Sequence, residues 1–203
     1  PDIDAYLEHL TPAGDEILEE MEEFAKRKEF PIVGPLVGRL LFQLAVVSGA
    51  KNVLELGSGF GYSAYWFAKA VGEGGSVIFT DTSGENARMA ADYFGRAGMR
   101  ERLDILTGNA LSVLEESRGG FDMIFNDIDK EYYPLVIDAA YEKLRKGGMF
   151  ITDNVLWSGR VLTDDVSPGT EGVREFTRRL LAHGGFFTSI IPLRDGLSVS
   201  VKL

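Results

Sequence analysis

The sequence predicts an α/β fold, a doubly wound and mostly parallel sheet to which a C-terminal hairpin adds one antiparallel strand. Short apolar runs alternate with helical segments along the chain, the order typical of a parallel sheet covered by helices. A glycine-rich turn, Gly57–Gly61, follows the first apolar run. The last two apolar runs are joined only by residues 192–196, a hairpin-like turn. Ligands of such sheets bind beyond the carboxyl ends of the strands, so residues at those ends are candidates for function.

Each element follows from a local pattern. Thr11 and Pro12 predict a helix start, because a capping hydroxyl precedes a proline at the first helical position. The apolar run 121–126 indicates a strand buried on both faces, and the polar run 158–172 predicts a loop. Helices are expected at residues 11–28, 36–48, 62–71, 83–97, 110–117, 132–144 and 171–183. Strands are expected at residues 53–56, 76–81, 103–107, 121–126, 149–152, 186–191 and 197–202.

Length and composition favour a globular protein of one domain. The 203 residues suit a single domain, 1–203, with residues 1–35 as an N-terminal helical extension. The net charge of −10 argues against general binding of phosphate backbones, and the absence of cysteine excludes disulfides and thiolate chemistry. No run approaches the roughly 20 apolar residues of a membrane span, and residues 1–4 lack the features of a signal peptide. We therefore expect a cytoplasmic protein.

The glycine turn and two acids indicate the cofactor. The glycines are spaced G-x-G-x-G, and Tyr62 stands where the last glycine of the dinucleotide fingerprint G-x-G-x-x-G is expected. Glu55 lies inside the preceding strand, and Asp81 ends the next one. Two acids suit a ligand that has a cationic amino-acid end and a ribose, such as S-adenosylmethionine. A nucleotide-binding module or an NAD-dependent reductase is the alternative, which the missing third glycine disfavours.

A second cluster of polar residues follows two later strands. Asp127 and Asp129 come after the strand 121–126, and Asp153 and Asn154 come after the strand 149–152. If these strands are neighbours, Asp127, Asp153 and Asn154 converge. Oxygen donors without histidine or cysteine describe a site for a hard cation, with magnesium favoured over calcium or manganese. The simpler interpretation treats these residues as ordinary turn and capping residues.

Together these motifs resemble the metal-dependent class I O-methyltransferases related to caffeoyl-CoA and catechol O-methyltransferase. The resemblance extends from about Phe30 to Leu203 and implies a seven-stranded, Rossmann-like sheet and commonly a homodimer. It implies that Asp127, Asp153 and Asn154 bind the metal. It also implies a set of cofactor-binding residues, namely Val33, Glu55, Gly57, Ser58, Gly59, Ser63, Asp81, Asn109, Ala110, Asp127 and Asp129. Asn109 and Asn126 depart from the usual residues of the family at their positions.

This resemblance predicts methyl transfer to a hydroxyl of a catechol-like small molecule. Lys130 and Asp127 are the expected catalytic residues, because a lysine beside a cation and partly buried has a lowered pKa and can accept the phenol proton. The alternative for Lys130 is a surface lysine paired with Asp129 or Glu131. An alternative acceptor is a hydroxylated wobble uridine of tRNA, which the acidic charge disfavours and a basic patch would favour.

Overall fold

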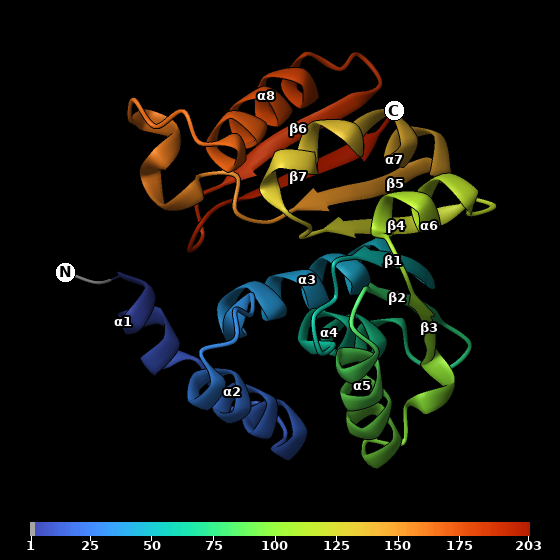
Figure 1. The fold of residues 1–203 in the computed structure, drawn as a ribbon. Helices are drawn as coiled ribbons and strands as arrows, with labels where there is room; N and C mark the ends of the chain where they lie inside the picture. Colours follow the sequence, from blue (N-terminus) through green and yellow to red (C-terminus); the bar gives the residue numbers. More distant parts are fainter. Residues whose placement is uncertain (1–2) are drawn as a thin grey trace.

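A seven-stranded sheet runs through the molecule in the order β3-β2-β1-β4-β5-β7-β6 (Figure 1). The computed structural model describes residues 3–203; Pro1 and Asp2, used above in the argument about a signal peptide, lie outside this range. Neighbouring strands from β3 to β5 pair in parallel, whereas β7 is antiparallel to both β5 and β6. The strands are β1 (Asn52–Leu56), β2 (Ser76–Asp81), β3 (Leu103–Thr107), β4 (Phe121–Asn126), β5 (Leu144–Thr152), β6 (Phe186–Ile191) and β7 (Leu197–Lys202). The predicted fold class is confirmed.

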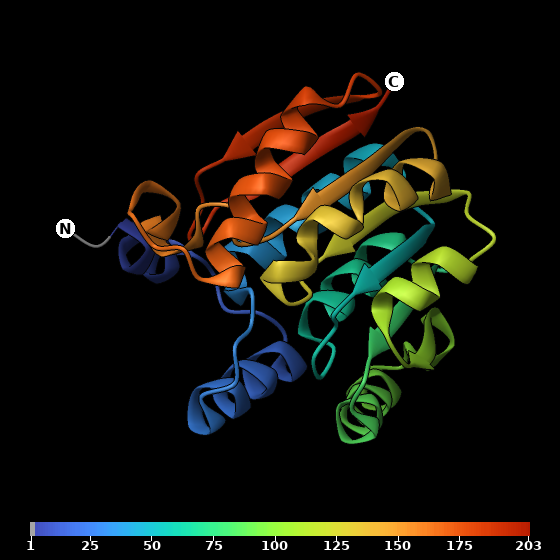
Figure 2. The ribbon, with the colours of Figure 1, turned by 45° about the horizontal axis from the view of Figure 1, so that its top comes forward.

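Helices cover both faces of this sheet (Figures 1 and 2). The α-helices are α1 (Ile3–Leu10), α2 (Glu16–Lys28), α3 (Gly34–Ser48), α4 (Tyr62–Val71), α5 (Gly84–Arg96), α6 (Ala110–Glu116), α7 (Ile137–Lys143) and α8 (Pro168–Ala182). Three short 3₁₀ segments are η1 (Arg100–Arg102), η2 (Lys130–Leu135) and η3 (Trp157–Leu162). Figure 2 shows α6, α7 and α8 in front of the sheet, with α3 and α4 behind it.

Two hydrophobic cores lie on the two faces because side chains alternate along each strand. Met123 and Phe125 of β4 join the core formed with α2 to α5, whereas Ile124 between them joins the core formed with α6 to α8. All three side chains are fully buried. Burial on both faces explains why residues 123–125 of β4 are all apolar, and it places the strand ends, rather than the strand faces, at the surface.

The predicted helix start at Thr11 is wrong. The helix α2 begins at Glu16, and the carboxylate of Asp15 caps it by accepting a hydrogen bond from the backbone N–H of Leu18 at 3.0 Å. The Thr11 hydroxyl instead donates to the carbonyl of Leu7, at the end of α1. The helix α1 was not predicted, although its apolar side chains follow helical spacing; these are Ile3, Tyr6, Leu7 and Leu10.

Three further boundaries differ from the prediction. The helix predicted at 132–144 is divided into η2 and α7, since Pro134 has no N–H to continue a helical ladder. The strand β5 begins at Leu144 rather than at residue 149, because Leu144 pairs with Phe121 across an irregularity in the register. The predicted loop 158–172 contains most of η3 and the first turn of α8, which begins at Pro168.

Within residues 3–203, no helix has the length and the apolar character needed to cross a lipid bilayer. The division of the chain into one domain with residues 1–35 as an extension stays a prediction.

Candidate active site

A cavity of about 450 Å³ lies at the carboxyl ends of the central strands, with the glycine turn on one side and the tips of β4 and β5 on the other. Nearly all the predicted site residues line it. They are Val33, Gly57, Ser58, Gly59, Ser63, Asp81, Asn109, Ala110, Asp127, Asp129, Lys130, Asp153 and Asn154. Glu55 is the predicted residue that does not line this cavity. The structure thus brings both predicted sites together into one space.

The glycine turn is fixed by hydrogen bonds to the end of β2. The backbone N–H of Ser58 donates to the carbonyl of Thr80 at 2.8 Å, and the N–H of Gly57 donates to the Thr80 hydroxyl at 3.2 Å. Gly57 has φ of +83°, and a Cβ there would lie 2.7 Å from the carbonyl oxygen of Asp127. Glycine is therefore required where the tips of β1 and β4 meet. Sequence reasoning missed Thr80, since its role depends on the pairing of β1 with β2.

Glu55 is fully buried behind the cavity wall. The Ser63 hydroxyl donates to one of its carboxylate oxygens, and the other oxygen has no hydrogen-bond partner among the described residues. Burial raises the pKa of Glu55 to about 7, against the hydrogen bond from Ser63, which lowers it. A buried oxygen without a partner beside the glycine turn fits the cationic amine of an amino-acid ligand, directly or through a water molecule.

Asp81 and Asn109 each have a side-chain oxygen that accepts hydrogen bonds from other groups of the protein. One oxygen of Asp81 accepts from the N–H of Ser83 at 2.7 Å and from the side-chain amide of Asn86 at 3.1 Å. The oxygen of Asn109 caps α6 by accepting from the N–H groups of residues 111 and 112. Asp81 therefore keeps its second oxygen available to accept from a ligand, whereas Asn109 retains only its amide N–H₂ as a donor.

The carbonyl of Val33 is occupied in a similar way. It accepts a hydrogen bond from the guanidinium of Arg194, which also donates to the carbonyl of Ile32 at 3.3 Å. The Val33 contact with a cofactor that the family resemblance implies would therefore use its N–H or its side chain. Arg194 comes from the turn between β6 and β7, and sequence reasoning had treated that turn as structural only.

Asp127 and Asp153 extend from paired positions on neighbouring strands. Asn126 of β4 is directly opposite Thr152 of β5, and the N–H of Asp153 donates to the carbonyl of Asn126 at 3.2 Å. Burial, and then the negative charge of Asp127, raise the pKa of Asp153 to about 7. Burial also raises the pKa of Asp127, although the Lys130 ammonium opposes this rise. A buried and a partly buried carboxyl group that disfavour each other's ionisation fit a bound cation.

Asn154 completes the candidate donor set. It adopts φ of +57°, a left-handed conformation that asparagine tolerates, and its amide N–H₂ donates to Asp195 at 3.3 Å. The amide oxygen is then the atom available to a cation. Among residues 3–203, no group of three or more histidine, cysteine, aspartate or glutamate side chains has the arrangement of a metal site. A site here consequently needs the amide oxygen, and oxygen donors of this kind suit magnesium or calcium.

Lys130 pairs with Asp127 rather than with Asp129 or Glu131. Its Nζ lies 2.7 Å from Asp127 Oδ1 and 3.3 Å from the carbonyl of Ile128. Its side chain is 14% exposed, so the interpretation as a surface lysine is wrong. Lys130 lines the same cavity as Asp127 and Asp153.

The aromatic residues near the site have different roles. Tyr132 lines the cavity, whereas Tyr133 is fully buried and its hydroxyl donates to the carbonyl of Asp153 at 3.0 Å. Tyr133 thus supports the tip of β5. Trp157 contacts Lys130, with Nζ 5.7 Å from the centroid of the indole ring. Burial and long-range pairing decide these roles, which the residue types alone do not reveal.

A larger cavity of about 910 Å³ adjoins the first one. The two share Asp153, Asn154 and residues 30–33. Its other walls come from α1, α2, the start of α3 and residues 158, 194 and 195. A ligand in this second cavity would therefore lie against Asp153 and Asn154.

Comparison with known proteins identifies the family. Residues 8–203 match the family model described as O-methyltransferase. The chain is 32% identical to a catechol O-methyltransferase from Niastella koreensis, over 98% of this chain and 96% of that protein. It is 27% identical to caffeoyl-CoA O-methyltransferase 1 from Eucalyptus globulus, over 98% of this chain and 89% of that protein.

A solved structure agrees with these relatives. The O-methyltransferase from Bacillus cereus in complex with SAH superposes with a TM-score of 0.89 and 30% identity, covering 99% of this chain and 97% of that one. Fold, length and sequence similarity thus coincide over almost the whole chain. The chain belongs to the O-methyltransferase family, which confirms the enzyme class predicted from its sequence, an S-adenosylmethionine-dependent O-methyltransferase.

Proposed function

We propose that this protein transfers the methyl group of S-adenosylmethionine to one hydroxyl of a small catechol-like molecule with the help of a divalent cation. The observation that carries the proposal is the single cavity whose opposite walls are the glycine turn and the tips of β4 and β5. A methyl donor on one wall and an acceptor oxygen on the other would meet within it. Positioning of this kind contributes several kcal/mol to catalysis.

The cofactor would occupy the side of the cavity formed by the glycine turn. Glu55 and Ser63 would receive the amino-acid end, and Asp81 would bind the ribose hydroxyls. Asn109 and Ala110 would lie against the adenine. The remaining lining residues of this side would contact the cofactor through backbone groups; these are Val33, Gly57, Ser58 and Gly59. The complex of the Bacillus cereus relative with SAH supports a cofactor of this class.

The cation would be held by Asp127, Asp153 and Asn154, with magnesium favoured. When bound, it supplies a lower pKa for a coordinated phenol and a fixed orientation for two vicinal oxygens. Lys130 Nζ would accept the proton of the reacting hydroxyl, and Asp127 would hold that ammonium in place. Asp129 would contribute to the cofactor side of the same wall. The phenolate oxygen then forms a bond to the methyl carbon while the bond between that carbon and the sulfonium sulfur breaks.

The second cavity supports a small neutral or cationic acceptor. Its lining includes six acidic and two basic residues. The acidic residues are Asp4, Glu8, Glu22, Glu29, Asp153 and Asp195, and the basic ones are Lys26 and Arg194. Such a wall would repel the phosphates of a coenzyme A thioester or of tRNA. The name of the Niastella relative agrees with a catechol acceptor, whereas the tRNA alternative has no support.

Turnover of a simple catechol with and without a chelator tests this proposal. We expect methylation that EDTA abolishes and that added Mg²⁺ restores, and caffeoyl-CoA should be a much poorer acceptor. Activity that is unchanged after metal removal would contradict the metal dependence. A preference for caffeoyl-CoA would contradict the small acceptor. The homodimer and the cytoplasmic location stay predictions.

A further inference from the structure

Lys130 is supported from behind by three residues of the segment 157–172, namely Trp157, Thr170 and Gly172, which together we call the buttress. Lys130 lines the cavity, and its backbone packs against the first turns of α8. A Cβ at Gly172 would collide with the carbonyl oxygen of Lys130 and would lie 2.8 Å from the Cα of Glu131. The two backbones are thus as close as two segments can approach without a side chain between them.

The close approach of the two backbones explains why residue 172 is a glycine, whereas its own backbone conformation does not require one. It has no positive φ and lies within the helix α8. Glycine is a poor helix former, and alanine would serve better at such a position if space allowed. Gly169, one turn earlier, has space, because a Cβ there would lie 3.5 Å from Trp157 and 3.6 Å from the Cβ of Lys130, which is ordinary contact.

Trp157 forms the second part of the buttress. The Nζ of Lys130 lies over its ring, and the indole N–H donates to the hydroxyl of Thr170 at 3.1 Å. Trp157 has φ of +47°, an uncommon conformation for a bulky residue, so surrounding contacts must hold it. Thr170 is fully buried.

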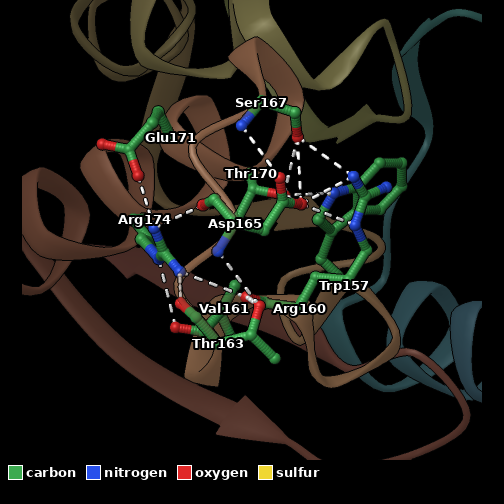
Figure 3. A network of polar contacts seen from close by, with 9 residues as sticks. All are labelled: Trp157, Arg160, Val161, Thr163, Asp165, Ser167, Thr170, Glu171 and Arg174. Carbon is green, nitrogen blue, oxygen red and sulfur yellow. Dashed lines mark hydrogen bonds and ion pairs between the residues drawn. The ribbon is translucent and has the colours of Figure 1, made fainter.

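The carboxylate of Asp165 fixes Thr170 in turn (Figure 3). It accepts hydrogen bonds from the Thr170 hydroxyl at 2.6 Å, from the Ser167 hydroxyl at 3.0 Å and from Arg160 Nε at 2.7 Å. These bonds lower the pKa of Asp165, with that from Thr170 the largest cause. Hydrogen bonds to the single carboxylate of Asp165 therefore hold together residues 160–170, which are partly irregular.

Arg174 closes the same network from α8. Its guanidinium donates to the carbonyl of Val161 at 3.1 Å and to that of Asp165 at 2.8 Å (Figure 3). The chain between η3 and α8 is thereby tied to the helix that contacts Lys130.

We propose that the buttress is a positioning element for Lys130, in which Gly172 sets the place of its backbone and Thr170, through Trp157, sets the place of its side chain. The inference rests on the proposed function, because Lys130 is the proton acceptor there. The buttress touches neither substrate, and it acts only through Lys130. A displacement of Lys130 should therefore slow catalysis without weakening the binding of the cofactor.

Two alanine substitutions in the first turns of α8 test this role. Gly172→Ala adds a methyl group against the backbone of Lys130, and Gly169→Ala adds the same group where space exists. We expect Gly172→Ala to lower kcat by about 10- to 100-fold, since a misplacement of about 1 Å can cost about 100-fold. The affinity for SAH, measured by calorimetry, and KM for the catechol should change less than about threefold. Gly169→Ala should keep the kcat of the unmodified enzyme.

A kcat of Gly172→Ala that matches the unmodified enzyme would overturn the inference. Equal losses of kcat and of SAH affinity would also overturn it, because they would show a merely structural role, and so would an equal loss of kcat in Gly169→Ala. Lys130→Ala, measured beside them, separates the two proposals. Full activity of Lys130→Ala refutes the role of Lys130 in the proposed function, whereas a slow Lys130→Ala beside a fully active Gly172→Ala refutes the buttress alone.

Thr170 provides the test if Gly172→Ala does not fold. Thr170→Val removes the acceptor of the Trp157 N–H, and Thr170→Ser keeps a hydroxyl at that position. We expect Thr170→Val to lower kcat by about 10-fold with unchanged affinity for SAH, and Thr170→Ser to restore most of the activity. Equal activity of the two variants would overturn the role of Thr170.

Discussion

The glycine turn and the tips of β4 and β5 face each other across one cavity, but they are built on different physical principles. The glycine turn depends on backbone conformation and on neutral hydrogen bonds that the N–H groups of Gly57 and Ser58 donate to Thr80. The strand tips depend on charge, with the buried carboxyl group of Asp153, the partly buried one of Asp127, and Lys130 in close contact with Asp127. We call the glycine turn the glycine wall and the tips of β4 and β5 the charged wall. The glycine wall should tolerate changes of charge at its surface but no added Cβ atoms. The charged wall should tolerate small changes of shape but no loss of charge.

Removal of a carboxylate from the charged wall should have the largest effect. Asp153→Ala is expected to lower kcat by at least about 100-fold if Asp153 holds the proposed cation, because loss of a ligand should cost at least as much as loss of a residue that only orients one. SAH affinity should change little, since the glycine wall is intact. Steady-state kinetics with Mg²⁺ and calorimetry with SAH check both expectations.

Asp122 provides the control at the opposite end of the same strands. It accepts hydrogen bonds from the N–H groups of Lys51 and Asn52 and pairs with Arg145. Asp122→Ala should lower the free energy of unfolding and leave kcat nearly unchanged. A similar loss of kcat in both variants would mean that the two ends of the sheet do not differ in function.

Glu55 is the charge hidden within the glycine wall, and it should make stability depend on pH. Its pKa rises from 4.5 to about 7 on folding. Between these values the folded state binds a proton that the unfolded state releases, so the free energy of unfolding falls as pH rises, by about 3 kcal/mol in total. Glu55→Gln should remove this part of the dependence of the free energy of unfolding on pH, which we call the slope. Urea unfolding of the ligand-free protein at pH 5 and pH 8 measures it.

Asp153 also has a pKa raised to about 7, so some slope should remain in Glu55→Gln. Glu85→Gln, at an exposed position of α5, is the matched control and should keep the slope of the unmodified protein. An identical slope in Glu55→Gln and in the unmodified protein would contradict the raised pKa.

A methyl group at Gly57 should disturb both walls at once. Gly57→Ala combines a positive φ with a contact of 2.7 Å to the carbonyl of Asp127. Gly74 has a similar φ of +74° but open space around its Cβ position. Both variants carry the strain of the left-handed conformation, and Gly57→Ala should cost about 2 kcal/mol more through the collision. Urea unfolding compares them, and equal losses would show that the two walls are not in rigid contact.

The smallest effect is expected at Asn109. Asn109→Ala removes the cap of α6 and should lower the free energy of unfolding by about 1 kcal/mol, whereas Asn109→Asp keeps a capping oxygen and should retain it. If the amide N–H₂ also binds adenine, both variants should bind SAH somewhat more weakly. Thermal unfolding and calorimetry separate the two roles. Equal stability of Asn109→Ala and the unmodified protein would contradict the capping role.

Local patterns of the sequence predicted most elements and most residues of the site. The glycine spacing, the apolar strands and the acids at strand ends are each visible within a few consecutive residues. The errors arose where two local signals competed. Thr11 with Pro12 resembled a helix start, yet Asp15 provides the cap, and Pro134 divides a segment whose periodicity suggested one helix.

The sequence by itself determined the fold class, the glycine turn and the candidate ligands at the ends of β4 and β5. These features depend on backbone conformation and on the alternation of side chains within single elements. Only the tertiary structure decided that Glu55 is buried behind Ser63, that Thr80 holds the glycine turn and that Gly172 packs against Lys130. The contacts of Thr80 and Gly172 join residues far apart in the chain, and the contact of Glu55 with Ser63 joins a strand to the helix that follows it. They arise because strand order and helix packing bring these segments together, which no local pattern encodes.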